Sequence, residues 1–209
     1  MSVRSDPERS VTTVARRAQI VSAAIATIAE LGFAKASFAQ IARRADLSST
    51  RLISYHFAGK DDLVEAVVAE VFTVAGRFIE PYVLAESTQA GKLRAFIEAS
   101  ARFYSEYRQH VIAVRDIWVR FRTGDDLLRF GLHTHEPEFQ VVAEIFAAGQ
   151  ESGEFRRFDA RTMAITLRHA LDGLATQVSA DPDLDVDSYT RELVQMFDRA
   201  TRRDPECDE

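Results

Sequence analysis

The chain has 209 residues, of which 46% are hydrophobic, and its formal net charge at pH 7 is −6. This length and hydrophobic content allow one large core or two smaller ones. No apolar run approaches the roughly 20 residues of a membrane-spanning helix, and the first residues hold no secretion signal, so we expect a cytoplasmic protein without a membrane partner. The single cysteine, Cys207, excludes a disulfide framework and a cysteine metal site.

Charge is distributed unevenly along the chain. Up to Lys60 there are nine Lys and Arg residues against four Asp and Glu, a net charge of +5, whereas the remaining residues carry 17 against 28, a net charge of −11. A basic segment at one end of an acidic protein is typical of a chain that binds a polyanion there. The acidic remainder is repelled by such a partner and helps to orient the docking.

The first predicted helix follows a leader of residues 1–12, which we expect to be disordered, and it ends at Gly32. Ser37 begins the next helix, because its hydroxyl can cap the first turn while Gln40 closes a capping box. Asp46 and Leu47 supply a tight turn. Either Ser48 or Ser49 then caps a third, short helix. The apolar stripe of the first helix comprises Val14, Ala18, Val21, Ile25 and Ile28.

Two short helices joined by a tight turn are the layout of a helix-turn-helix DNA reader, whose second helix enters the major groove. The side chains on the exposed side of that helix must be short and polar, or basic. Its expected anchor side, which packs on the helices behind it, is formed by Leu52, Ile53 and Phe57. Spacing alone leaves an ordinary pair of helices as an equal alternative. The predicted DNA-binding residues are Ser37, Ser48, Ser49, Thr50, Arg51, Ser54, Tyr55, His56 and Lys60.

The stretch from Ala15 to about Phe72 resembles the N-terminal domain of the TetR family of bacterial transcriptional regulators. The chain departs from the family pattern at Asp46, where the family usually has glycine. It departs again at Thr50 and Arg51, which stand near a position where glycine is common in the family. The resemblance implies a repressor that binds a DNA operator and carries a pocket for a small-molecule effector. The matching pieces are Ala-Glu-Leu-Gly-Phe over Ala29–Phe33, Ser37-Phe38, Gln40-Ile41-Ala42, the serine-initiated helix, Tyr55-His56-Phe57, Lys60 and Asp62-Leu63.

Helical periodicity continues to the end of the chain. A fourth helix begins at Asp61 or Asp62 and ends at Pro81. Residues 89–108 and 110–122 form one long helix or two abutting ones, and 125–135 are ambiguous between a short helix and a loop. Pro137 begins another helix, which runs to Gly149 or Ser152. Asp159 then caps a helix to about Ser179, and Asp185 or Asp187 caps a last one to about Arg203. We therefore expect an all-α fold of about nine helices. It comprises a helix-turn-helix domain over 13–59, a larger effector-binding and dimerisation domain over 60–203, and a disordered tail over 204–209.

The middle of the chain is rich in aromatic residues, and the family resemblance implies an effector pocket there. Arg115, Trp118 and Arg122 would share one helix face and suit an anionic or aromatic effector. A solvated face, with Asp116 as a partner, is the stronger alternative. The candidate effector-binding residues are Phe103, Tyr107, Arg115, Trp118, Phe121, Arg122 and Phe146.

The last two predicted helices are amphipathic and favour a homodimer. Two such helices can bury their apolar stripes against the same pair of a second copy, which makes a four-helix bundle. The alternative is that both stripes pack only on their own body. The predicted interface residues are Met163, Leu167, Leu171, Leu174, Val178, Leu193, Met196 and Phe197.

Two other classes of function receive less support. His133 and His135 alternate with neighbouring residues as in a polar loop, so we expect no metal and no cofactor. The sequence holds no glycine-rich phosphate loop, nucleophile elbow or convergent pair of carboxylates, and we assign no catalytic residue. An all-α enzyme and a helical protein-interaction module without a DNA role remain the alternatives to a DNA-binding regulator.

Overall fold

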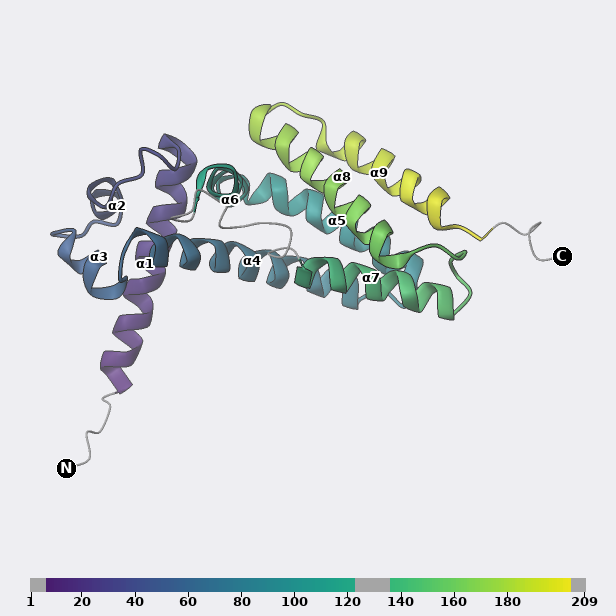
Figure 1. Ribbon diagram of the computed structural model, residues 1–209, viewed down its shortest axis with the longest axis horizontal. Coiled ribbons are helices and arrows are strands. Elements are labelled where there is room, and N and C mark those ends of the chain that lie inside the picture. Colours follow the sequence, from purple (N-terminus) through teal and green to yellow (C-terminus); the bar gives the residue numbers. More distant parts are fainter. Residues whose placement is uncertain (1–6, 123–135, 204–209) are drawn as a thin grey trace. The chain divides into compact units, whose positions relative to one another are not determined.

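The computed structural model describes residues 7–122 and 136–203. Over these residues the chain is helical, with an isolated antiparallel bridge between Phe155 and Arg202. The expected all-α fold is confirmed. No helix within these ranges is long and apolar enough to cross a membrane. The helices are α1 (Pro7–Leu31), α2 (Phe38–Arg44), α3 (Arg51–His56), α4 (Lys60–Leu84), α5 (Gln89–Glu106), α6 (Arg108–Arg120), α7 (Glu136–Glu151), α8 (Ala160–Ala180) and α9 (Val186–Thr201) (Figure 1).

These helices divide into two compact units. Unit 1 runs to Thr73, inside α4, and resumes at Gln109 with α6. Unit 2 contains the rest of α4, all of α5 up to Arg108, and α7, α8 and α9. The domain boundary that we expected, between residues 59 and 60, falls at the start of α4, whereas the division between the two compact units falls inside α4, after Thr73. The helical periodicity of the sequence does not indicate that α6 belongs to unit 1.

Two helix boundaries differ from the expected ones. α1 begins at Pro7, so residues 7–12, expected in the leader, are part of the helix. A proline suits the first helical position, because its missing N–H would have no partner there. α4 continues through Pro81 to Leu84. Because Pro81 lies in the last turn, it costs the helix one backbone hydrogen bond close to an end that would fray in any case.

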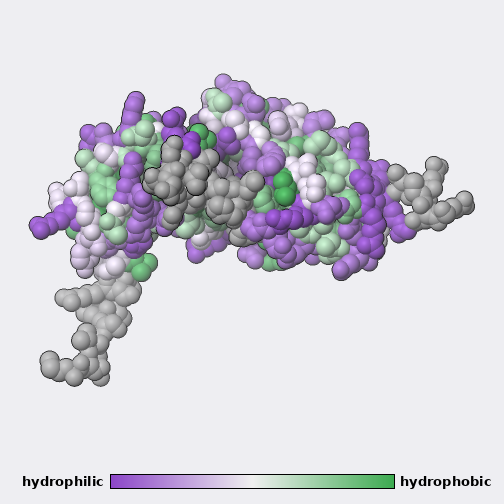
Figure 2. Space-filling model, in the orientation of Figure 1, coloured by the Kyte–Doolittle hydropathy of each residue, from purple (hydrophilic) through white to green (hydrophobic). Residues whose placement is uncertain are grey.

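Unit 2 is built around α5, which packs against α7, α8 and α9 (Figure 1). α8 also packs against α7 and α9. The apolar stripe of α8 faces this core, where Leu167, Leu171 and Leu174 are completely buried. The surface view shows hydrophilic residues interspersed with hydrophobic ones (Figure 2), and Val141 and Met196 are among the exposed large apolar side chains of this unit.

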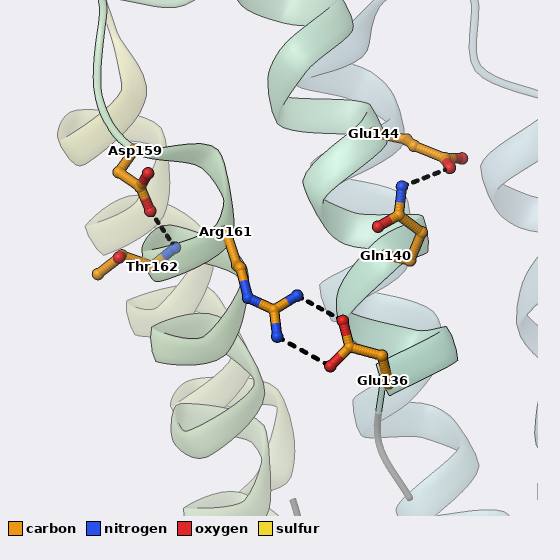
Figure 3. Close-up of polar contacts among 6 residues, drawn as sticks. All are labelled: Glu136, Gln140, Glu144, Asp159, Arg161 and Thr162. Carbon is orange, nitrogen blue, oxygen red and sulfur yellow. Dashed lines mark hydrogen bonds and ion pairs between the residues drawn. The ribbon is translucent and has the colours of Figure 1, made fainter. Parts of the chain in front are cut away.

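Local contacts fix the start of α8 (Figure 3). The carboxylate of Asp159 accepts the N–H of Thr162 at 2.6 Å, which confirms the predicted cap. Arg161 donates both terminal nitrogens to the carboxylate of Glu136 at the start of α7, with 2.9 Å between Nη2 and Oε2. The hydrogen bond from Arg161 lowers the pKa of Glu136. Because this ion pair is exposed, it orients the two helix ends more than it stabilises them.

Glu154 performs a similar role for α5. Its two carboxylate oxygens accept the N–H groups of Gln89 at 3.1 Å and Ala90 at 3.0 Å. These bonds satisfy donors that the first turn of a helix leaves free, and the negative charge complements the helix dipole. The N–H of Ala90, followed by that of Gln89 and the hydroxyl of Ser152, lowers the pKa of Glu154 below its ordinary value of 4.5.

We expect Glu154→Gln to lower the stability of unit 2 at neutral pH and to flatten its acid dependence. A lowered carboxyl pKa means that the stabilisation is fully present above pH 4.5 and is lost as the pH falls through the folded value. The wild type and the variant should therefore converge as the pH falls below 4, as measured by urea unfolding at pH 7, 5 and 3.5. A difference between them that is independent of pH would contradict this assignment.

Candidate DNA-binding interface

The helix-turn-helix begins with α2, which is capped as the sequence predicts. The hydroxyl of Ser37 accepts the N–H of Gln40 at 3.3 Å. The capping box expected of Gln40 is not formed, because its side chain accepts a hydrogen bond from Arg43, within α2, and does not reach back to Ser37. Ile41 and Ala42 are buried and hold α2 against α1.

The turn after α2 is closed by two backbone hydrogen bonds. The N–H of Asp46 donates to the carbonyl of Arg43 at 3.3 Å, and the N–H of Leu47 donates to that of Ala42 at 2.9 Å. This pair of bonds is a Schellman motif, which requires a left-handed residue just after the helix. Asp46 takes that position with φ of +50°. Aspartate tolerates the left-handed region better than most residues, but glycine has no Cβ penalty there.

Asp46→Gly is accordingly expected to stabilise unit 1 by about 1 kcal/mol. The matched control is Ala39→Gly, a change to glycine at an exposed position inside α2, which should destabilise the same unit by about 1 kcal/mol. Thermal unfolding followed by circular dichroism measures both changes. If Asp46→Gly lowered the melting temperature as Ala39→Gly does, the strain assigned to this turn would be absent.

α3 begins at Arg51, and its N-terminal flank differs slightly from the prediction. Thr50 is the N-cap residue and makes no side-chain capping bond. The capping role expected of Ser48 or Ser49 falls to Ser49, whose hydroxyl accepts the N–H of Arg51 at 3.2 Å. On the inner side of α3, Ile53 is completely buried, and Phe57 is buried just after the helix ends.

The outer side of α3 presents Arg51, Ser54 and Tyr55, all of them exposed. Tyr55 projects furthest, with 79% of its surface accessible. Leu52 was expected on the anchor side but is also exposed. Successive residues are turned by about 100° around a helix, so Leu52 cannot share the inner face that Ile53 occupies. Leu52 therefore joins the outer face, where sequence reasoning had not placed it.

The nine predicted DNA-binding residues all lie in unit 1, and all but the half-buried His56 are exposed. The ring of His56 meets that of Tyr55 edge to face, with 5.1 Å between the ring centres. Lys60, the first residue of α4, donates to the backbone carbonyl of Phe33 at 3.3 Å. Its Nζ atom lies over the Phe33 ring, 4.4 Å from the ring centre. Lys60 thus has a structural role in addition to its predicted role at a phosphate.

Arg17 of α1 has a structural role at this site that the sequence did not reveal. Its guanidinium donates to the backbone carbonyl of His56 and lies 4.1 Å from the centre of the Phe57 ring. The Oδ1 atom of Asp62 lies 4.0 Å from the Nη2 atom of Arg17. Arg17 therefore fixes the C-terminal end of α3 onto α1. Its main partner is a carbonyl 39 positions away, so no local pattern could have identified it.

The seven predicted effector-binding residues fall in both units. In unit 2, Phe103 is buried and stacks on Tyr107 with 4.9 Å between ring centres. Phe146, in the same unit, is completely buried against Phe155 and Phe158, as a core residue. A cavity of about 330 Å³ in unit 2 lies between the C-terminal end of α5 and the loop joining α8 to α9, and none of the seven lines it.

The four remaining residues of that set lie in unit 1. Trp118 is half-buried beside Phe72, and Phe121 is buried against Phe33. Arg122 was expected on one helical face with Arg115 and Trp118, but α6 ends at Arg120. The expected helical alignment of the three side chains is therefore wrong, because Arg122 lies beyond the helix.

The predicted dimer residues also require correction. Six of them are buried within their own chain, so they are unavailable to a partner. The amphipathic stripes therefore indicate burial correctly but not what buries them. Met163 is half-buried and Met196 is exposed. The six buried residues are Leu167, Leu171, Leu174, Val178, Leu193 and Phe197.

Three residues discussed for metal binding or redox chemistry, His133, His135 and Cys207, lie outside the described residues. Within the described ranges, no group of three or more His, Cys, Asp or Glu side chains is arranged to hold a metal ion.

An all-helical chain with a basic N-terminal segment, whose short third helix is exposed after a tight turn, is a helix-turn-helix DNA-binding protein. Comparison with known proteins agrees. Residues 20–67 match the family model for bacterial regulatory proteins of the tetR family. Residues 89–202 match the model for the C-terminal part of BetI-type transcriptional repressors. The chain belongs to the TetR family of bacterial transcriptional regulators.

Individual relatives support this assignment. The HTH-type transcriptional regulator BetI of Cronobacter sakazakii is 30% identical over 167 residues, which cover 76% of this chain and 77% of that protein. BetI of Pectobacterium carotovorum is 34% identical over 87 residues, which cover 41% of this chain and 44% of that protein.

Among solved structures, the fold is similar to FadR from Bacillus subtilis in complex with stearoyl-CoA. That match has a TM-score of 0.74 at 20% identity and covers 86% of this chain and 96% of the other. A putative transcriptional regulator from Pseudomonas aeruginosa PAO1 matches with a TM-score of 0.69 at 24% identity, covering 95% and 97% of the two chains. At these identities the similarity concerns the fold alone.

Proposed function

We propose that this regulator is a homodimeric, ligand-responsive repressor that acts in the cytoplasm on a palindromic operator. The observation that carries the proposal is the exposed outer face of α3 on a segment with a net charge of +5. In a dimer, two such helices would enter successive major grooves about 34–36 Å apart. We assign the chain no catalytic activity.

The nine DNA-binding residues divide by the chemistry of their side chains. We assign Ser37, Tyr55, His56 and Lys60 to phosphates, because hydroxyl, imidazole and ammonium groups at the edges of a reading head fix its register on the backbone. Arg51 is the principal base-reading residue, since a guanidinium can donate two bonds to one guanine. We assign Ser48, Ser49, Thr50 and Ser54, whose side chains are short, to base edges and adjacent backbone.

For the dimer, we propose an interface formed by the outward sides of α8 and α9, with Met196 at its surface. An exposed methionine on an amphipathic helix is a suitable contact for a second copy. Light scattering at micromolar concentration should give the mass of a dimer. Met196→Glu should then shift the protein toward monomer, whereas Val141→Glu, equally exposed on α7, should not. A monomeric wild type would refute this part of the proposal.

The effector is proposed to be an organic molecule bound by the helical body. The stacked pair Phe103 and Tyr107, with Phe78 at 5.5–5.9 Å from both, offers aromatic surface in unit 2. Stearoyl-CoA is a reasonable first probe, because it is bound to FadR of Bacillus subtilis, which has the same fold. A probe that acts as the effector should raise the melting temperature and weaken DNA binding at the same concentration.

The direct test of the proposed function is selection of bound duplexes from a random-sequence library. We expect the recovered sites to share two half-sites related by a two-fold axis, because a symmetric dimer reads a symmetric operator. Recovery of unrelated sequences would indicate that the chain does not read DNA in a sequence-specific way.

A further inference from the structure

The corner between α1 and α2 is held from two directions. Phe33, the second residue after α1, donates its backbone N–H to the Oδ2 atom of Asp116 on α6 at 2.5 Å. Its carbonyl accepts a hydrogen bond from Lys60 on α4 at 3.3 Å. The Phe33 ring is buried, with Lys60 above it and the ring of Phe121 at 5.7 Å. All of these residues belong to unit 1.

The N–H of Phe33 needs a partner because of the way α1 ends. Gly32, with φ of +81°, closes the helix with a single bond from its own N–H to the carbonyl of Ile28 at 2.9 Å. In the fuller Schellman motif, such as the one after α2, the next N–H would also bond back into the helix. Here that donor is satisfied by the carboxylate of Asp116, 83 positions along the chain.

The contact with Asp116 is a charge-assisted hydrogen bond in a partly buried place. The other carboxylate oxygen, Oδ1, accepts the Nε–H of Arg120 at 2.6 Å, and only 21% of the Asp116 side chain is exposed. A bond from a backbone N–H to an ionised group is stronger than one between neutral groups. The hydrogen bond from Phe33 to Asp116 therefore fixes the position of the backbone at Phe33.

The position of Phe33 matters for DNA reading, because Ser37, the N-cap of α2, follows only four residues later. The C-terminal end of α3 is fixed through Arg17 on α1. A shift at Phe33 would therefore move α2 against α1 and turn the outer face of α3. We propose that Asp116 is a positioning residue for operator binding, which acts through Phe33 and makes no contact with DNA.

This inference rests on the proposed operator binding, and charge gives it a distinctive sign. Asp116→Ala removes a negative charge, so electrostatics alone would strengthen binding to DNA. If Asp116 positions the reading head, the same variant should instead weaken binding to the selected operator about tenfold. Binding to a scrambled duplex should not weaken, and the salt dependence should stay unchanged, because no phosphate contact is lost.

Two variants complete the test. Arg120→Ala removes the partner of Oδ1 but leaves the bond to Phe33, and it should retain operator affinity within about twofold. Asp116→Asn keeps an acceptor oxygen of the same shape and should recover most of the affinity lost in Asp116→Ala. The amide of Phe33, followed by NMR in a nitrogen-labelled sample, should lose protection from exchange in Asp116→Ala and regain it in Asp116→Asn.

The outcomes separate a failure of the proposed operator binding from a failure of the positioning role of Asp116. If the wild type does not prefer the selected operator, the proposed function fails. If the wild type prefers it and folded Asp116→Ala binds it equally well or more tightly, the function stands and the positioning role of Asp116 is refuted. If Asp116→Ala does not fold, the decision rests on Asp116→Asn: a loss of affinity together with a protected Phe33 amide would also overturn the proposal.

Discussion

Phe146→Ala is expected to destabilise unit 2 by about 3–5 kcal/mol, as large-to-small changes of buried aromatic residues do. The Phe146 ring is completely buried and meets Phe155 and Phe158 with 6.1 Å and 5.4 Å between ring centres. Its removal leaves a cavity that the neighbouring rings can only partly fill. Urea unfolding of the ligand-free protein measures the loss.

This prediction separates a core role for Phe146 from the effector-binding role that its sequence position favoured. Tyr82→Ala is the control, because Tyr82 is an aromatic residue of the same unit that is 39% exposed, and its loss should cost far less than that of Phe146. If Phe146→Ala kept the stability of the wild type, the ring would not be a core element. It would then return to the list of candidate effector contacts.

Arg51→Ala should reduce discrimination at one base pair of the operator by about 1–3 kcal/mol, which is the usual value of a bidentate base contact. Arg51 lies at the start of α3 with its side chain exposed beside Tyr55. The expected result is a relaxed preference at that base pair in a selection experiment, with a smaller loss on the scrambled duplex.

Lys60→Ala is the comparison for Arg51→Ala. Lys60→Ala should weaken binding to every sequence and lower the slope of binding against salt by about 1, because a phosphate contact is lost. Loss of its hydrogen bond to Phe33 should add a smaller weakening on the operator, without changing the preference at any single base pair. Fluorescence anisotropy at several salt concentrations measures both variants. Reversed effects, with Lys60→Ala changing base preference and Arg51→Ala changing only the salt slope, would refute the two role assignments.

The parts of the fold that the sequence predicts well are the local ones. Ser37 and Asp159 cap their helices as expected, because a capping bond spans only three residues. The turn at Asp46 was also expected, and Asp46 adopts the left-handed backbone conformation there, with φ of +50°. The face of α3 was predicted except at Leu52, which is exposed because it lies about 100° around the helix from the buried Ile53.

The parts that the sequence does not predict depend on partners far along the chain. Asp116 was interpreted as a partner of nearby basic residues, yet it also holds Phe33, and no periodicity reports such a contact. The stripe that includes Leu171 and Leu174 indicates a buried face, but a second copy and the chain's own α5 would produce the same stripe. Periodicity reports that a face is buried and not which surface covers it.

The central claim, that this chain reads DNA through α3, is tested most directly by an anisotropy titration at two salt concentrations. The duplex from upstream of the gene would be compared with a scrambled duplex of the same length. We predict tight binding that favours the natural sequence and weakens steeply as salt rises, because lysine and arginine contacts release counterions. Equal binding to both duplexes, followed by failure of a random-sequence selection, would contradict the claim.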